Sequence, residues 1–201
     1  MQPVPRTKTD KKYSWQDYLK WPDEERWEVI DGIAYDMSPS PTPRHQILAG
    51  NFYGILRNKL HGKRCRPFVA PLDVYLDDHN FVQPDVLAIC DEVKIKDRIY
   101  GAPDMVVEVL SPSTSLKDKR EKKTLYERFG VKEYVVIHPD EVFIERYALK
   151  EGRYGEPDLY GATEVLSLHA LDEMEIPLWE VFETEPPQEA DAQSSAEVEV
   201  K

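Results

Sequence analysis

The run DMVVEVL, residues 104–110, decides the fold, because it is apolar between its first residue and its last except at Glu108. A strand that is apolar on both faces lies in the interior of a sheet. An ionised carboxylate inside such a strand costs roughly several kcal/mol unless a cation compensates it. The run VQPDVLAI, residues 82–89, repeats the pattern with Asp85. The two carboxylates therefore predict a shared cation.

A lysine-rich segment, LKDKREKKTLYERFG at residues 116–130, follows the first run. It predicts a helix, because a SPST turn precedes it and Gly130 is suited to end it. Asp118, Lys122 and Tyr126 are spaced four apart and share one face of this helix. We expect that face to hold Lys122 over the two acids.

This set of residues predicts metal chemistry. If the strands of Asp85 and Glu108 are neighbours, their carboxylates converge at one sheet edge, where two oxygen ligands and water suit magnesium or manganese. A metal there can activate a water molecule in line with a phosphodiester bond. Lys122 would orient that water or stabilise the transition state. The alternatives are that the carboxylates pair with arginines and that the lysine is solvated.

The amino-terminal half predicts a hairpin followed by a helix. RWEVI and IAYDM flank Asp31-Gly32, a strong signal for a two-residue turn, which puts Glu28 in mid-strand. After the segment SPSPTP, residues 38–43, apolar residues recur at helical spacing. We expect a helix of about four turns that ends near Gly62.

Further strands follow. CRPFVAPLDVYL (65–76) and FVQPDVLAIC (81–90) are rich in β-branched and aromatic residues, and the cluster LDDHN joins them, so we expect one antiparallel pair with Asp85 on its second strand. Pro84 implies a bulge or an edge position there. EYVVIH and VFIERYAL predict another hairpin around Pro139-Asp140.

Length and composition predict one globular domain, since the chain has 201 residues and is 41% hydrophobic. We expect a flexible amino-terminal arm at 1–13, a domain at 14–182 and a disordered acidic tail at 183–201, where bulky apolar residues are almost absent.

The net charge of -12 argues against a chain-wide attraction to nucleic acid. Basic residues cluster at 63–66 and 117–123, which permits a positive rim on an acidic body; solvated helix faces and turns are the alternative. The chain shows no signal-peptide pattern and no apolar run long enough for a membrane span, so we expect a cytoplasmic protein. Cys65 and Cys90 are far apart in sequence, and we interpret them as buried, reduced thiols.

At this point the order of motifs resembles a known family, the Uma family of restriction-endonuclease-like proteins in the PD-(D/E)XK nuclease superfamily. The resemblance rests on WEVIDG around Glu28, SPSPTPRHQ at 38–46, APLDV at 70–74, VQPDV at 82–86, GAPDMVVEVLSPST at 101–114, Asp118, Lys122 and LYERFGVKEY at 125–134.

The resemblance implies an α/β fold, a restriction-endonuclease-like core with a central mixed β-sheet flanked by helices. It implies that Asp85 and Glu108 are the metal-binding acids, Lys122 the catalytic lysine and Glu28 a supporting acid. The activity it implies is endonucleolytic cleavage of DNA with Mg (or Mn), and we expect a homodimer, as in relatives that have a lone catalytic core.

Two positions depart from the pattern. The superfamily motif puts its lysine two residues after the acid, but Val109 and Leu110 follow Glu108 here, so the lysine must come from the helix. We choose Lys122 over Lys123, which points about 100° away. His138 stands where family members often carry aspartate, and we interpret it as peripheral.

Four other residues are secondary candidates. His45 could contact phosphate at a helix N-terminus, or it could cap or pack. Tyr126 could donate to a site carboxylate or belong to the core, Asp104 suits a capping role, and Asp73 is expected near the Asp85 strand without being a ligand. The rival hypothesis is a catalytically idle nuclease-like fold that binds proteins.

Overall fold

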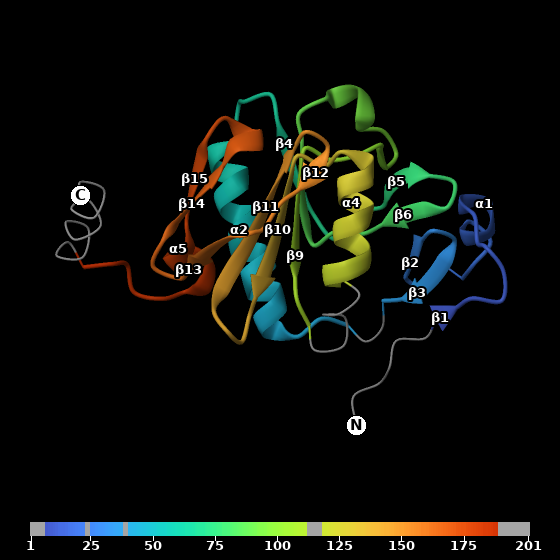
Figure 1. The fold of residues 1–201 in the computed structure, drawn as a ribbon, viewed down its shortest axis with the longest axis horizontal. Coiled ribbons are helices and arrows are strands. Elements are labelled where there is room, and N and C mark those ends of the chain that lie inside the picture. Colours follow the sequence, from blue (N-terminus) through green and yellow to red (C-terminus); the bar gives the residue numbers. More distant parts are fainter. Residues whose placement is uncertain (1–6, 23–24, 38–39, 112–117, 189–201) are drawn as a thin grey trace.

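The computed structural model describes residues 7–22, 25–37, 40–111 and 118–188. A central sheet carries helix α2 (Pro43–Lys59) on one face and helix α4 (Lys123–Phe129) on the other (Figure 1). A second sheet lies beside α4, and its Ile30 and Val82 join the apolar cluster beneath that helix. This arrangement agrees with the mixed α/β fold expected from the sequence.

The central sheet has the strand order β12-β11-β10-β9-β7-β4, and β13 also pairs with β11. Its strands are β4 (Arg66–Val69), β7 (Val86–Ile89), β9 (Met105–Val109), β10 (Glu133–His138), β11 (Phe143–Lys150), β12 (Arg153–Tyr154) and β13 (Asp158–Gly161). β9 is parallel to β10 and antiparallel to β7, so the sheet is mixed. The prediction of an interior strand with Glu108 is confirmed, since β9 has a neighbour on each side and every residue in it is buried.

The second sheet has the order β1-β3-β2-β6-β5-β8. Its strands are β1 (Thr7–Lys8), β2 (Trp27–Ile30), β3 (Ile33–Asp36), β5 (Val74–Asp77), β6 (Asn80–Val82) and β8 (Ile99–Tyr100). The β2–β3 hairpin turns at Asp31 and Gly32, which both have positive φ. The predicted hairpin is therefore confirmed, and Glu28 lies within β2 as expected.

The antiparallel pair predicted for 65–76 and 81–90 is only partly correct. Each run is divided between the two sheets, with β4 pairing with β7 in one and β5 pairing with β6 in the other. Pro71 and Pro84 stand between the pieces, and proline cannot donate to a strand ladder. Asp85 consequently lies immediately before β7 rather than inside a strand.

The helices begin and end where local chemistry favours it. Thr42 accepts from the N–H of His45 at the start of α2, where Pro43 is the first residue. Gly130, at φ 80°, ends α4. A π-helical segment, Asp118–Lys122, leads into α4, while the predicted SPST cap falls largely outside the described residues.

Six short elements complete the fold within the described residues. Helix α1 (Trp15–Tyr18) begins after Ser14, which forms reciprocal hydrogen bonds with Asp17. Strands β14 (Val165–Leu168) and β15 (Met174–Pro177) form a separate pair, and helix α5 (Leu178–Phe182) follows. A turn of 3-10 helix spans Glu92–Lys94 between β7 and β8, and another spans His169–Leu171.

The amino-terminal end of the domain differs from the expected boundary. Strand β1 pairs with β3 and Tyr13 is buried, so the fold extends into the arm expected at 1–13, of which residues 1–6 lie outside the description. Residues 183–188 are exposed and irregular, and the rest of the predicted tail is not described.

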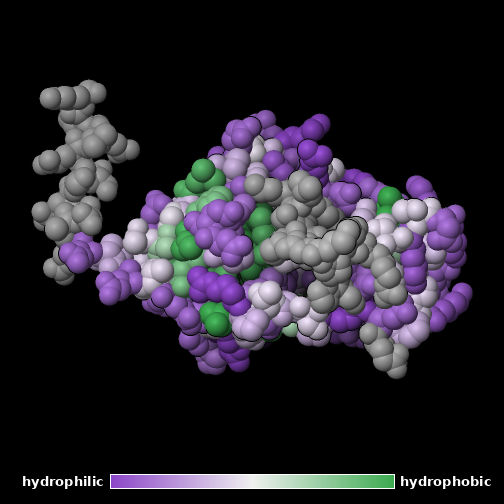
Figure 2. All heavy atoms as spheres, turned by 90° about the horizontal axis from the view of Figure 1, so that it is seen from below, coloured by the Kyte–Doolittle hydropathy of each residue, from purple (hydrophilic) through white to green (hydrophobic). Residues whose placement is uncertain are grey.

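Polar side chains cover most of the face in Figure 2. None of the described helices combines the length and apolarity that a membrane span requires.

The interpretation of the cysteines as reduced thiols is wrong for this structure. Cys65 and Cys90 are both buried, as expected, but they form a disulfide. They lie next to the paired residues Arg66 and Ile89 of β4 and β7, so antiparallel pairing brings them together across 25 positions of sequence.

The β2–β3 turn requires glycine at Gly32. Its φ is +81°, and an added Cβ would lie 2.9 Å from Cβ of Lys12. We predict that Gly32→Ala lowers the free energy of unfolding by about 2 kcal/mol in urea titrations. Gly54→Ala, in the open middle of α2, should instead raise it by about 0.5 to 1 kcal/mol. Equal effects of the two substitutions would contradict this account of the turn.

Candidate functional site

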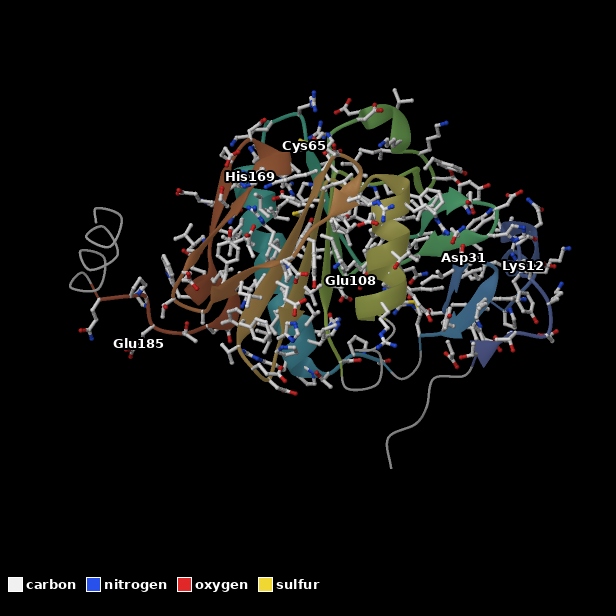
Figure 3. All side chains as sticks on the ribbon, in the orientation of Figure 1. Lys12, Asp31, Cys65, Glu108, His169 and Glu185 are labelled. Carbon is white, nitrogen blue, oxygen red and sulfur yellow. A yellow bond between two sulfur atoms is a disulfide. The ribbon has the colours of Figure 1, made fainter. Side chains whose placement is uncertain are left out.

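Glu108 and α4 form the centre of the site. Glu108 comes from the interior strand β9 and is buried beneath α4 (Figure 3). Lys122 Nζ donates to Glu108 Oε1 at 2.8 Å, and Tyr126 Oη donates to the same oxygen at 2.7 Å. The predicted shared face of Lys122 and Tyr126 is therefore confirmed, and the structure does not describe the side chain of Asp118, the third residue of that face.

Glu28 enters the same cluster from the second sheet. Its Oε1 lies 2.8 Å from Lys122 Nζ and accepts a 3.0 Å hydrogen bond from the N–H of Gln83. The side chain of Lys122 is only 4% exposed. An ammonium group is thus held between two buried carboxylates that belong to different sheets.

Asp85 lies beside this cluster, immediately before the first residue of β7. Val86 pairs with Val107, so the same antiparallel register sets Asp85 opposite Glu108. Its Oδ2 accepts a 2.8 Å hydrogen bond from the N–H of Val109. The Asp85 side chain is 19% exposed, which makes it the site carboxylate that solvent reaches.

Tyr126 is a hydrogen-bond donor and a core residue at once. Burial, followed by the charge of Glu108, raises the pKa of Tyr126 well above its usual 10. The phenol therefore stays protonated and donates to Glu108 throughout the neutral range. Both alternatives considered from the sequence apply, because the ring is fully buried against Tyr134.

The donor set suits a hard divalent cation. The site holds three carboxylates, Glu28, Asp85 and Glu108, and one ammonium, that of Lys122, which contacts Glu28 and Glu108, so two formal negative charges remain. Across the described ranges, Asp85 Oδ1 accepts no hydrogen bond and no group of three His, Cys, Asp or Glu side chains is placed to enclose a metal. Magnesium is commonly held by one or two carboxylates plus waters, so Asp85 and Glu108 fit it.

His45 contacts Asp85, a contact that the sequence did not predict. Its Nε2 lies 3.2 Å from Asp85 Oδ2, and its buried Nδ1 has no hydrogen-bond partner in the described structure. Its side chain does not cap α2, because Thr42 fills that role. The side-chain Nε2 of Gln83 donates a hydrogen bond to Asp73, and the backbone N–H of Gln83 donates one to Glu28. Asp73 therefore contacts the site only through Gln83.

Sequence reasoning missed Glu145, which shares a row with Glu108. In the register of β9, β10 and β11, Val136 pairs with both glutamates, so their side chains lie on the same face of the sheet. Glu145 is buried, accepts from Tyr147 Oη at 2.7 Å and lies 3.3 Å from His138 Nε2. The signal was weaker than at Glu108, since Glu145 and Arg146 stand together as a charged pair in the run VFIERYAL.

We predict that Lys122→Met destabilises the protein by about 3 to 5 kcal/mol at neutral pH, because it leaves two buried carboxylates without their cation. Urea unfolding measures the loss. The neighbouring substitution Lys123→Met is the matched control and should cost less than about 1 kcal/mol. If the two variants are equally stable, Lys122 does not hold this cluster together.

Asp104 has the capping role expected from its place before β9. Its Oδ2 accepts from the N–H of Cys90 at 2.7 Å, and its Oδ1 accepts from Lys132 Nζ at 2.7 Å. Burial alone would raise the pKa of Asp104, but these two hydrogen bonds and the charge of Lys132 outweigh it and lower that pKa below 3.8.

A lowered folded-state pKa stabilises the protein above the unfolded pKa, and the effect is lost as the pH falls through the folded value. We therefore predict that Asp104→Asn lowers the free energy of unfolding by about 1 kcal/mol at pH 7. The difference in free energy of unfolding between the variant and the wild type should become smaller as the pH falls below 3.8, as measured by urea titrations across this range. A gap that stays constant with pH would exclude the ionised carboxylate as its cause.

Sequence comparisons identify related proteins. The family model Uma2, described as "Putative restriction endonuclease", matches residues 15–178. A Synechocystis protein, "Uncharacterized protein slr1290", is 30% identical over 141 residues, which cover 68% of this chain and 74% of that protein.

A solved structure shows the same fold. It is titled "Crystal structure of a putative nuclease belonging to DUF820 from Anabaena variabilis", and it superposes with a TM-score of 0.71 at 20% identity, over 85% of this chain and 97% of that one. The chain has a restriction-endonuclease-like nuclease fold. It belongs to the Uma2 family.

Proposed function

We propose that the protein is a metal-dependent endonuclease that hydrolyses phosphodiester bonds in DNA. The observation that carries the proposal is the cluster of three carboxylates and one buried lysine. This cluster keeps two formal negative charges beside the first residue of β7. Membership of a family described as "Putative restriction endonuclease" supports the reaction class and the substrate.

In this proposal Asp85 and Glu108 hold Mg (or Mn). When bound, the metal would activate water and offset charge on the phosphate oxygens. Asp85 suits this role because its carboxylate is oriented by the N–H of Val109 and remains partly exposed. Tyr126 and Lys122 both donate to Oε1 of Glu108, which keeps that carboxylate in one position.

Lys122 is the proposed catalytic lysine, and Glu28 is its positioning residue. Nζ of Lys122 is held by Glu28 and Glu108, so the cation is fixed before substrate arrives. A preorganised cation stabilises developing negative charge without reorganising during the reaction. Lys123 is disfavoured, because its ammonium lies over the ring of Tyr147 instead.

The rival function is that of an idle nuclease-like fold that binds other proteins. The ammonium of Lys122 already lies between Glu28 and Glu108, and the chain is strongly acidic, and both observations fit that rival. Metal binding separates the two hypotheses, since only the enzyme needs Asp85 and Glu108 to bind Mn²⁺. The homodimer and the cytoplasmic location remain proposals, and light scattering of the purified protein tests the first.

The deciding experiment measures Mn²⁺ binding by calorimetry and cleavage of plasmid and oligonucleotide DNA with Mg²⁺. We predict that Asp85→Asn and Glu108→Gln lose Mn²⁺ binding and reduce cleavage at least about 100-fold. Lys122→Ala should reduce cleavage similarly yet still bind Mn²⁺. Glu92→Gln, at an exposed glutamate paired with Arg66, is the matched control and should resemble the wild type.

Two results would contradict the proposal. Equal cleavage by the wild type and the three site variants would mean that the activity comes from elsewhere. Absence of both Mn²⁺ binding and cleavage in the wild type would favour the protein-binding rival. Thermal unfolding of each variant shows whether a loss of activity reflects a loss of folding.

A further inference from the structure

His45 reaches Asp85 from a different layer of the fold. It is the third residue of α2, whereas Asp85 immediately precedes β7 of the central sheet. The imidazole of His45 is buried, and its Nε2 lies 3.2 Å from Asp85 Oδ2. The function proposed above does not use this contact.

The backbone that carries His45 is anchored on both sides of this residue's position in the first turn of α2. The side chain of Thr42 accepts from the N–H of His45 at 3.2 Å. The guanidinium of Arg44 donates from both terminal nitrogens, at 3.3 Å, to the carbonyl of Phe182 in α5. A ring on a helix end that is tied down in this way can position the group that it contacts.

Two contacts meet at one oxygen of Asp85. The N–H of Val109 donates to Oδ2 at 2.8 Å, and Nε2 of His45 approaches the same oxygen from α2. A single hydrogen bond leaves an aspartate carboxylate broad freedom to turn about its Cβ–Cγ bond, and a second contact from another element restricts that turning. Among the described residues Oδ1 accepts no hydrogen bond, so it is the oxygen left for a metal ion.

An imidazole is a costly group to bury at this position. Nδ1 of His45 is buried and has no hydrogen-bond partner within the described structure. A buried polar nitrogen without a partner destabilises the fold, and an aliphatic side chain would avoid that loss. The cost directs attention to the other ring nitrogen, Nε2, which contacts Asp85.

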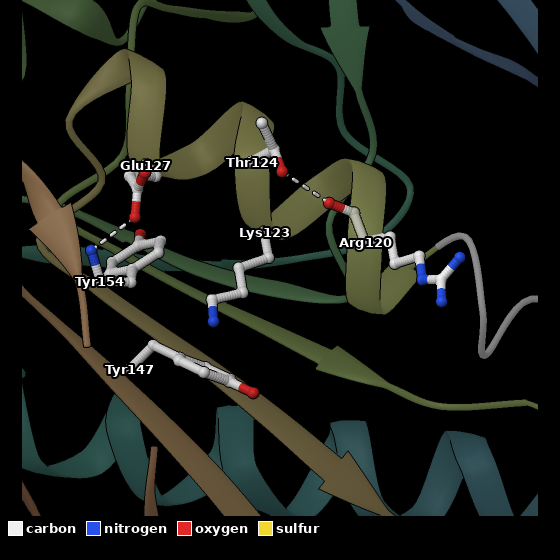
Figure 4. A pocket seen from close by; sticks show the side chains of 6 residues that line it. All are labelled: Arg120, Lys123, Thr124, Glu127, Tyr147 and Tyr154. Atoms are coloured by element: carbon white, nitrogen blue, oxygen red, sulfur yellow. Dashed lines mark hydrogen bonds between the residues drawn. The ribbon is translucent and has the colours of Figure 1, made fainter. Parts of the chain in front are cut away.

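Within the described ranges, no lysine or arginine makes an ion pair with Asp85. Lys122 is held between two glutamates, while Arg120 and Lys123 line a pocket beside Tyr147 (Figure 4). Lysine and arginine donate hydrogen bonds only as cations, whereas a neutral imidazole also donates one N–H. A histidine can therefore orient Asp85 without adding a positive charge that repels a divalent metal ion.

We propose that His45 is a positioning residue, which orients the carboxylate of Asp85 and so raises the affinity of the site for a divalent metal ion. This inference rests on the proposed function and deepens it by naming the group behind one of its metal-binding carboxylates. Removing a side chain that orients a metal ligand typically weakens metal binding about 10- to 100-fold.

The test measures Mn²⁺ affinity by calorimetry in the absence of DNA. His45→Leu and His45→Asn should each raise the Kd for Mn²⁺ at least about tenfold, because neither side chain brings an N–H to Asp85. His45→Gln should raise it less than about threefold, since the amide nitrogen of glutamine reaches the place of Nε2 and that of asparagine only the place of Nδ1. His61→Leu, at an exposed histidine just beyond the end of α2, is the control and should leave the Kd unchanged.

A second measurement separates positioning from catalysis. The Leu and Asn variants of His45 should need more Mn²⁺ for half-maximal DNA cleavage, yet return to the wild-type rate at saturating Mn²⁺, because His45 acts only through a metal-binding carboxylate. Urea unfolding in EDTA checks that each variant is folded. The two variants are separate tests, so the comparison survives if one of them does not fold.

The outcomes separate this inference from the proposed function. If the wild type and the folded Leu or Asn variant bind Mn²⁺ equally well, the inference is wrong and the metal site of Asp85 and Glu108 is unaffected. If His45→Gln loses as much affinity as His45→Asn, the packing of the ring matters and not its N–H, which also overturns the inference. If the wild type binds no Mn²⁺, the proposed metal site fails and this inference fails with it.

Discussion

The ammonium of Lys122 between Glu28 and Glu108 is the interaction on which the rest of the structure depends. The two carboxylates come from different sheets, and Lys122 comes from the segment leading into α4, so one cation joins three parts of the fold. Burying either carboxylate without that cation would cost several kcal/mol, roughly. The packing of the apolar cluster beneath α4 is therefore most stable when the three charges are in contact.

The same cluster has a buried end and a partly exposed end. At the buried end, Oε1 of Glu108 accepts hydrogen bonds from both Lys122 and Tyr126. The other end, at Asp85, is partly exposed and contacts the backbone of Val109 and the ring of His45. A site with a buried interior and a partly exposed edge suits a ligand that arrives from solvent.

The parts of the fold that could be predicted were those that a short stretch of sequence determines locally. Asp31-Gly32 specifies its hairpin locally, and the unbroken apolar run around Glu108 requires an interior strand. The prediction failed where a run of strand-forming residues contained proline, because Pro84 divides its run between two sheets. It failed also at Cys65 and Cys90, whose pairing depends on the register of two strands and not on spacing.

By itself, the sequence determined which carboxylates are costly to bury, since a charged residue inside an apolar run is visible without coordinates. It also determined that Lys122 and Tyr126 share a helix face, because helical periodicity is local. Only the tertiary structure decided that Glu28 approaches Lys122 from a second sheet and that His45 contacts Asp85. Such contacts depend on how separate elements pack, and packing distances are set by the whole core and not by any one segment.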